Sequence, residues 1–105
     1  MEQFTINIEQ ICQANKVTRE HGKVIHDIIM QNWDSFDRIV VDFDNILIAS
    51  VSFFDEAFGA LSVRYSTDEI ARKLKLMNIR EFDRNLANSI YTSRLRQKKL
   101  QNHGG

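Results

Sequence analysis

Apolar residues along the chain follow two spacings, every second residue in some segments and every third or fourth residue in others. Segment 4–8 (FTINI) alternates apolar and polar residues and predicts a half-buried strand. From Thr18 to Trp33 the apolar residues recur at helical spacing, which predicts an amphipathic helix packed on a sheet. Segment 38–43 (RIVVDF) is apolar on both faces and predicts a central strand that is covered on both sides.

The middle of the chain predicts a turn, a short apolar run and a second helix. Asp44 and Asn45 have turn chemistry, and segment 46–49 (ILIA) is either a hairpin partner of the preceding strand or a continuation along the sheet edge. We expect Ser52 to cap the next helix, with Asp55 at its third position. An acidic residue in that place also suits the positive end of the helix dipole.

The rest of the chain predicts a short helix, a strand and a long helix. A helix start at 66–69 (STDE) precedes segment 74–79 (LKLMNI), which alternates and predicts a third main strand. A C-terminal helix begins near Phe82, and its basic end runs into a tail that we expect to fray. This order of elements predicts an α/β fold with a small mixed or parallel sheet covered by helices.

Length and composition bound the architecture. The 105 residues include no proline and no Gly/Ser-rich linker, so we expect one domain over residues 1–105. Within it, residues 1–16 form an N-terminal strand region and residues 94–105 form the basic helix end and tail. Cys12 is the only cysteine, which excludes an intrachain disulfide and a multi-cysteine zinc site. The sequence has no signal peptide and no apolar run long enough to cross a bilayer, so we expect a cytoplasmic protein.

The net charge is zero, but the two halves of the chain differ in sign. Residues 1–63 hold four Lys+Arg and ten Asp+Glu, whereas residues 64–105 hold ten and four. One interpretation is an acidic working surface with a basic C-terminal element, and the other is that solvated faces differ by chance. The basic end could contact nucleic acid, or it could be a solvated helix end whose cations suit the helix dipole. Its candidate contacts are Arg94, Arg96, Lys98 and Lys99.

Candidate catalytic chemistry is limited to Asp42 and Asp44. A D-x-D at the carboxyl end of a strand resembles phosphotransferase and phosphatase sites, in which the first Asp is a nucleophile and both bind Mg²⁺. The alternative is that Asp42 pairs with a buried donor and Asp44 makes an Asx turn. Because no lysine or acidic pair follows a later strand in the arrangement such a site needs, we expect no enzyme activity.

Signals for metal and phosphate binding are missing from the sequence. His21 and His26 are five residues apart, not the four that place two ligands on one helix face. There is no G-x-S-x-G motif and no glycine-rich phosphate loop, so we expect no metal site and no cofactor. Gly59 falls inside a predicted helix, where it marks either the close approach of a partner's backbone or tight packing within the domain.

The most specific stretch of the sequence runs from Val41 to Gly59. It holds VDF and, from residue 49, ASVSFFDEAFG. These motifs resemble the strand and the strand-to-helix junction of STAS-like domains, a fold shared by sulfate transporters and anti-sigma-factor antagonists. Segment 18–22 (TREHG) resembles the family's S-R-x-x-G helix start. The chain is similar to a STAS-like family of small uncharacterised bacterial and mobile-element proteins.

The resemblance also raises the question of a phosphorylation switch. In anti-sigma-factor antagonists the junction reads D-S-S-G, and a partner kinase phosphorylates its first serine. By position, Ser50 matches the Asp, Val51 the phosphorylated serine and Ser52 the serine that follows. Either Ser50 or Ser52 takes the phosphate, or the domain is not switched by phosphorylation, and we favour the second interpretation.

The resemblance implies a non-enzymatic regulatory module that binds a protein partner. The partner would be a histidine-kinase-like ATPase or an anti-sigma-type regulator. The alternative is a nucleic-acid-associated regulator that uses the basic C-terminal helix. The residues expected to form the partner-binding region are Ser50, Val51, Ser52, Asp55, Glu56 and Gly59.

Overall fold

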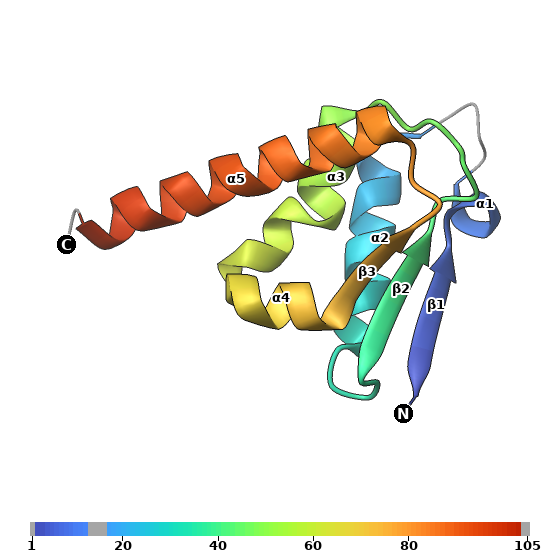
Figure 1. The fold of residues 1–105 in the computed structure, drawn as a ribbon, viewed down its shortest axis with the longest axis horizontal. Coiled ribbons are helices and arrows are strands. Elements are labelled where there is room, and N and C mark those ends of the chain that lie inside the picture. The colour runs from blue at the N-terminus through green and yellow to red at the C-terminus, as the bar shows by residue number, and fades with distance from the viewer. Residues whose placement is uncertain (1, 13–16, 104–105) are drawn as a thin grey trace.

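The computed structural model describes residues 2–12 and 17–103, and Figure 1 shows the arrangement of their helices and strands. In chain order the elements are β1 (Gln3–Asn7), α1 (Ile8–Ile11), α2 (Arg19–Asn32), β2 (Arg38–Asp42), α3 (Val51–Ala57), the 3-10 helix η1 (Gly59–Val63), α4 (Thr67–Lys73), β3 (Leu74–Met77) and α5 (Glu81–His103). The three main strands and the four helices predicted after the first strand are therefore confirmed, although β3 ends at Met77.

The three strands form one parallel sheet in which β2 lies between β1 and β3. The register pairs Ile39 of β2 with Phe4 of β1 and with Leu74 of β3. The predicted α/β fold and the central position of β2 are confirmed. Because parallel strands all end at the same edge of a sheet, the segments that follow β2 and β3 meet there. At this edge Phe43 N–H donates a hydrogen bond to the carbonyl oxygen of Met77 at 2.9 Å.

Within the described residues 2–12 and 17–103, helices cover one face of the sheet and leave the other without a helix. Ile39 and Val41 on the covered face are fully buried in the core. On the opposite face, Thr5 and Lys75 are exposed on either side of Val40. Figure 1 looks onto this open face, with α2 behind the strands. The prediction that β2 is covered on both sides is therefore wrong. Val40 is almost fully buried because it lies between the two flanking strands, without a second layer of helices.

Close packing between α2 and α3 fixes the position of α3. The backbone N–H of Thr18, which precedes α2, donates to Nδ1 of His21 at 3.1 Å and so closes the first turn of that helix. A Cβ atom on Gly22 would lie 2.7 Å from the carbonyl oxygen of Phe53. Only glycine allows the two helices to approach this closely without a shift of the backbone.

The apolar run after β2 forms no strand. Asp44, Asn45 and Ala49 have φ angles of 50°, 62° and 49°, a region that residues other than Gly, Asn and Asp rarely adopt. The hairpin prediction for segment 46–49 is therefore wrong. The segment instead passes over the carboxyl ends of the strands toward α3, as the green part of the chain shows in Figure 1.

Helix α5 is the longest element, with 23 residues, and its C-terminal part extends away from the other elements (Figure 1). Its middle part, from Ile90 to Lys98, packs on α3 and η1. Among the residues that the structure describes, no helix combines the length and the hydropathy needed to cross a membrane.

Candidate functional site

The junction between the segment after β2 and α3 is capped by Ser50, not by Ser52 as predicted. Ser50 Oγ accepts a hydrogen bond from Phe53 N–H at 3.2 Å, and its extended backbone leads directly into the helix at Val51. Ser52 lies in the first turn, with its Oγ 3.3 Å from that of Ser50. The cap is thus two residues earlier than expected, and Asp55 lies beyond the first turn of α3.

Val51 is the first residue of α3, and 60% of its surface is exposed. It is the residue that the sequence analysis matched to the phosphorylated serine of anti-sigma-factor antagonists. The next residues along α3, Phe53 and Phe54, are fully buried in the core. The junction therefore exposes an apolar side chain next to residues whose aromatic side chains belong to the core.

A buried carboxylate holds the segment that leads into this junction. Asp83, in the first turn of α5, is fully buried. Its Oδ2 accepts a hydrogen bond from Ile48 N–H at 2.7 Å, and its Oδ1 accepts one from Ala49 N–H at 2.8 Å. Two short charge-assisted bonds thus fasten the start of α5 to the residues just before the Ser50 cap. In Figure 1 the same segment runs beside the beginning of α5.

Asp83 is a site residue that the sequence analysis missed. An acidic residue in the first turn of a helix normally indicates a favourable interaction with the helix dipole. The two residues whose N–H groups it binds lie 35 and 34 positions earlier in the chain. No local pattern connects them.

The acidic residues predicted to face a partner are paired within the chain. Asp55 makes a two-pronged contact with Arg94 of α5, with both N–O distances at 2.8 Å. Hydrogen bonding to Asp55 raises the pKa of the Arg94 guanidinium. Glu56 Oε1 lies 3.8 Å from Nε of Arg19, in α2. These pairs attach α3 to its neighbouring helices, so the two carboxylates are less available to a partner than the sequence suggested.

Gly59 lies beneath α5 and is buried. A Cβ atom at this position would be 2.8 Å from Asp55 Oδ1 and 3.3 Å from Ile90 Cγ2. Of the two interpretations of this glycine, tight packing within the domain is the one that the structure supports. The glycine leaves room for the Asp55–Arg94 pair.

The chain matches a family described as a STAS-like domain of unknown function, over residues 21–83. The match covers more than half of the 105 residues. The chain belongs to this family. The resemblance inferred from its central segment is thereby confirmed. No curated protein and no solved structure matches the chain. In this STAS-like domain the matched residues include the whole junction and end at Asp83, whereas most of α5 lies beyond them.

The basic end of the STAS-like domain is only partly free. Arg94 is bound to Asp55, and Lys98 Nζ donates to the carbonyl oxygen of Ser62 at 3.1 Å. Arg96 and Lys99 are exposed. Two of the four predicted nucleic-acid contacts therefore hold α5 against α3 and η1.

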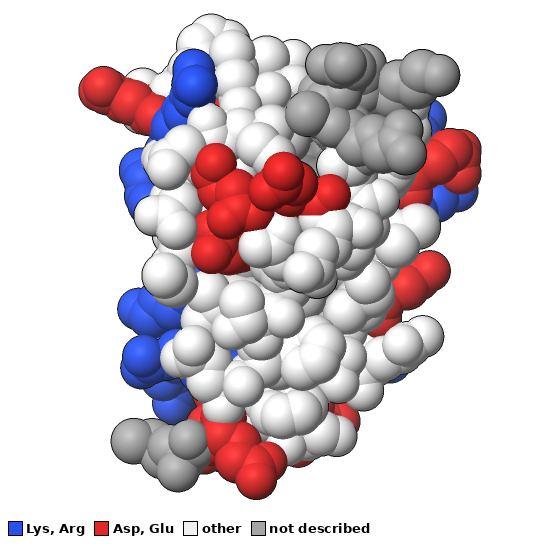
Figure 2. Space-filling view, turned by 90° about the vertical axis from the view of Figure 1, so that its right-hand side faces the viewer, with Lys and Arg blue, Asp and Glu red and all other residues white. Residues whose placement is uncertain are grey.

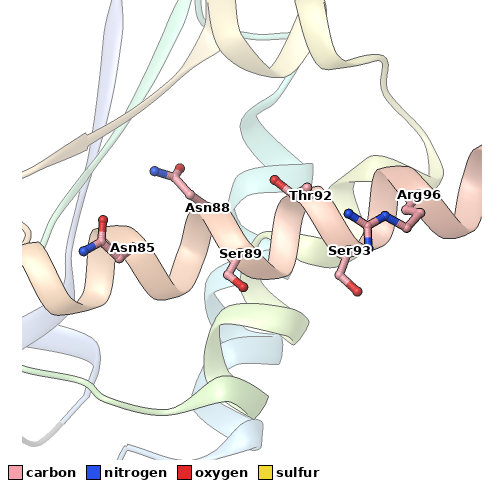
Figure 3. A pocket seen from close by; sticks show the side chains of 6 residues that line it. All are labelled: Asn85, Asn88, Ser89, Thr92, Ser93 and Arg96. Carbon is pink, nitrogen blue, oxygen red and sulfur yellow. The ribbon is translucent and has the colours of Figure 1, made fainter.

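The outward side of α5 carries a polar hollow, which Figure 3 shows from close by. All the side chains that line it come from α5 itself, and only one of them is charged. They are Asn85, Asn88, Ser89, Thr92, Ser93 and Arg96. With walls from a single helix, the hollow is a furrow on the surface and not an enclosed site.

The D-x-D pair forms a turn. Asp42 Oδ1 accepts hydrogen bonds from Asn78 Nδ2 at 3.0 Å and from Asp44 N–H at 2.9 Å. The bond from Asn78 and then that from Asp44 lower the pKa of the Asp42 carboxyl. Asp42, and not Asp44 as expected, is thus the acceptor of the Asx turn. Among residues 2–12 and 17–103, no group of three His, Cys, Asp or Glu side chains could hold a metal ion.

Proposed function

We propose that this STAS-like domain is a non-enzymatic regulatory module that binds a protein partner at the start of α3. The observation that carries the proposal is the exposure of three large apolar side chains on or next to the segments that meet at this junction. They belong to Leu47, Val51 and Phe82, which are 45%, 60% and 61% exposed, and we call them the junction surface. Large apolar side chains left exposed on neighbouring segments are typical of interaction sites.

The hydrogen bonds of Asp83 support this grouping. Leu47 directly precedes Ile48, and Phe82 directly precedes Asp83, so the Asp83–Ile48 bond brings their two segments together. Val51 follows two residues after Ala49, the second donor to the carboxylate. The junction surface is thus built on a segment held in one conformation. A preorganised segment lowers the entropic cost of binding a partner.

In this proposal Asp55 and Glu56 help to hold α3 in position and are not the main contacts with the partner. Their pairing with Arg94 and Arg19 fixes α3 in place. The contacts with the partner then fall mainly to apolar side chains around Val51. Family resemblance favours a histidine-kinase-like ATPase or an anti-sigma-type regulator as that partner.

We also propose that phosphorylation does not switch the module. Val51 has no hydroxyl at the matching position. Ser50 Oγ is engaged as the cap of α3, and Ser52 Oγ lies 3.3 Å from it. Incubation with the ATPase and ATP should therefore leave the intact mass unchanged, and a phosphoryl group on Ser50 or Ser52 would contradict this part of the proposal.

The decisive experiment is a calorimetric titration of the histidine-kinase-like ATPase encoded nearest to this chain. Val51→Asp should weaken binding at least about tenfold, equivalent to about 1.4 kcal/mol, because it places a charge in an apolar contact. Val63→Asp is the matched control, because Val63 is 71% exposed on η1, outside the junction surface. Equal affinities of the two variants would refute the junction surface, and no binding of the unmodified protein would refute the ATPase as partner.

A further inference from the structure

The open face of the sheet is a second surface that the proposed function does not use. Parallel sheets are normally covered on both faces, because the connections between their strands place helices there. Among the residues that the structure describes, no helix covers the face opposite α2 (Figure 1). Lys75 and Met77 of β3 point to that face, and Met77 is 46% exposed. An uncovered parallel sheet with an exposed methionine is an unpartnered surface.

Basic side chains gather beside β3 on this face. Arg84 Nη2 donates to the carbonyl oxygen of Leu76 at 3.4 Å, which places its guanidinium next to β3. Arg80 Nε donates to the carbonyl oxygen of Asn45 at 2.7 Å, just beyond the end of the strand. Figure 2 shows Lys and Arg side chains along its left-hand edge, the side that faces the viewer in Figure 1. We call Lys75, Met77, Arg80 and Arg84 the cationic β3 surface.

These cations have no acidic partner within the described part of the chain. The two ion pairs found there are Arg19–Glu56 and Arg94–Asp55, and both lie elsewhere. Carboxylates of Asp42, the register partner of Met77, and of Glu81 also lie at this surface. That of Asp42 is occupied by Asn78 and the Asp44 N–H, and Glu81 is exposed in the first turn of α5. Lys75, Arg80 and Arg84 are all exposed, so their charges are available to a partner.

We propose that the cationic β3 surface binds an acidic segment of a partner protein, with an apolar side chain of that segment on Met77. Charge complementarity selects the acidic partner, and an apolar centre with a charged rim is the usual anatomy of a protein interface. A nucleic acid fits less well. Sheets that bind single strands stack bases on aromatic side chains, and no strand residue of this face is aromatic. Those residues are Gln3, Thr5, Asn7, Arg38, Val40, Asp42, Lys75 and Met77.

The test is an NMR titration of the ¹⁵N-labelled protein with three probes. They are a glutamate-rich peptide with one central leucine, the same peptide with serine in place of the leucine, and a twelve-nucleotide oligo-dT. The leucine peptide should bind most tightly and shift the amide signals of residues 74–78 and 38–42. Lys75→Glu with Arg84→Glu should weaken its binding at least about tenfold, and Met77→Ala should remove its advantage over the serine peptide.

Arg96→Glu with Lys99→Glu is the matched control, because it makes the same charge change at two exposed residues near the far end of α5. Its affinity for the leucine peptide should equal that of the unmodified protein. Equal losses in both double variants would show attraction to net charge alone and would overturn the proposal. Tighter binding of oligo-dT with shifts at residues 74–78 would also overturn it, as would shifts confined to α5.

Discussion

Replacing Asp83 with asparagine should loosen the segment that carries the junction surface. The carboxylate is fully buried and accepts two N–H groups at 2.7 and 2.8 Å. Asparagine keeps the shape of the side chain, but it replaces one acceptor oxygen with a donor amide. One of the two backbone N–H groups, of Ile48 or Ala49, is then left without an acceptor.

The expected loss follows from these two bonds. Hydrogen bonds to a charged group contribute about 1.5–3 kcal/mol each, and a buried donor without a partner costs about 1–3 kcal/mol. Removing a buried charge also relieves its desolvation penalty, which offsets part of the loss. We therefore expect Asp83→Asn to lower the free energy of unfolding by about 2–4 kcal/mol. That is a large part of the about 5–15 kcal/mol typical of a domain.

Urea unfolding followed by circular dichroism measures this change, and hydrogen exchange locates it. The Ile48 and Ala49 amides should exchange much faster in the variant than in the unmodified protein, beyond what the global loss explains. Asp27→Asn is the control, because Asp27 is exposed on α2 and should change stability by no more than about 0.5 kcal/mol. If Asp83→Asn matched this control and both amides stayed protected, packing and not the carboxylate would hold the segment.

Three further predictions test separate parts of the fold. Ala49→Gly should raise the free energy of unfolding by up to about 1 kcal/mol in urea, because it removes the strain of a positive φ at alanine. A double-mutant cycle of Asp55→Ala and Arg94→Ala should give a coupling of about 1 kcal/mol, which additive effects would contradict. Asn78→Ala should raise the pKa of Asp42 toward its ordinary value in an NMR pH titration. The pKa of Asp42 is lower in the folded state than in the unfolded state, so its ionised carboxyl stabilises the fold at pH values above the unfolded-state pKa. This stabilisation is lost as the pH falls through the folded-state pKa. This contribution should shrink in the variant.

The main elements could be predicted because their signals are local. The alternation in 4–8 and 74–79 and the helical spacing after Thr18 are properties of neighbouring residues, and the structure has the corresponding strands and helix. The covering of the sheet was not predictable in the same way. A run such as RIVVDF indicates burial on both faces, and β2 achieves it through the flanking strands on one side. Periodicity reports how buried a residue is and does not report what buries it.

The junction was located correctly, but its details depend on contacts across long stretches of sequence. Ser52 followed by Asp55 fits a local capping pattern better than Ser50 does. In the structure Asp55 is instead bound to Arg94, 39 residues later, and is therefore not needed at the start of α3. Segment 46–49 was ambiguous for the same reason, because the N–H groups of Ile48 and Ala49 are satisfied by Asp83 and not by a neighbouring strand. Local rules fail here because a distant side chain satisfies the groups to which they apply.

Val51 shows how the structure changes the meaning of a family resemblance. A valine in place of a modified serine could reflect a position that had turned inward to the core, where an apolar side chain is favourable. The core is instead filled by Phe53 and Phe54, and Val51 remains exposed at the first position of α3. The exposed part of its apolar surface is not stabilised by burial in the isolated domain, and neither is the exposed part of Leu47 or Phe82. A partner that covers these three side chains would recover that stabilisation, so the position that in related switches controls binding through charge would here contribute to binding through apolar contact.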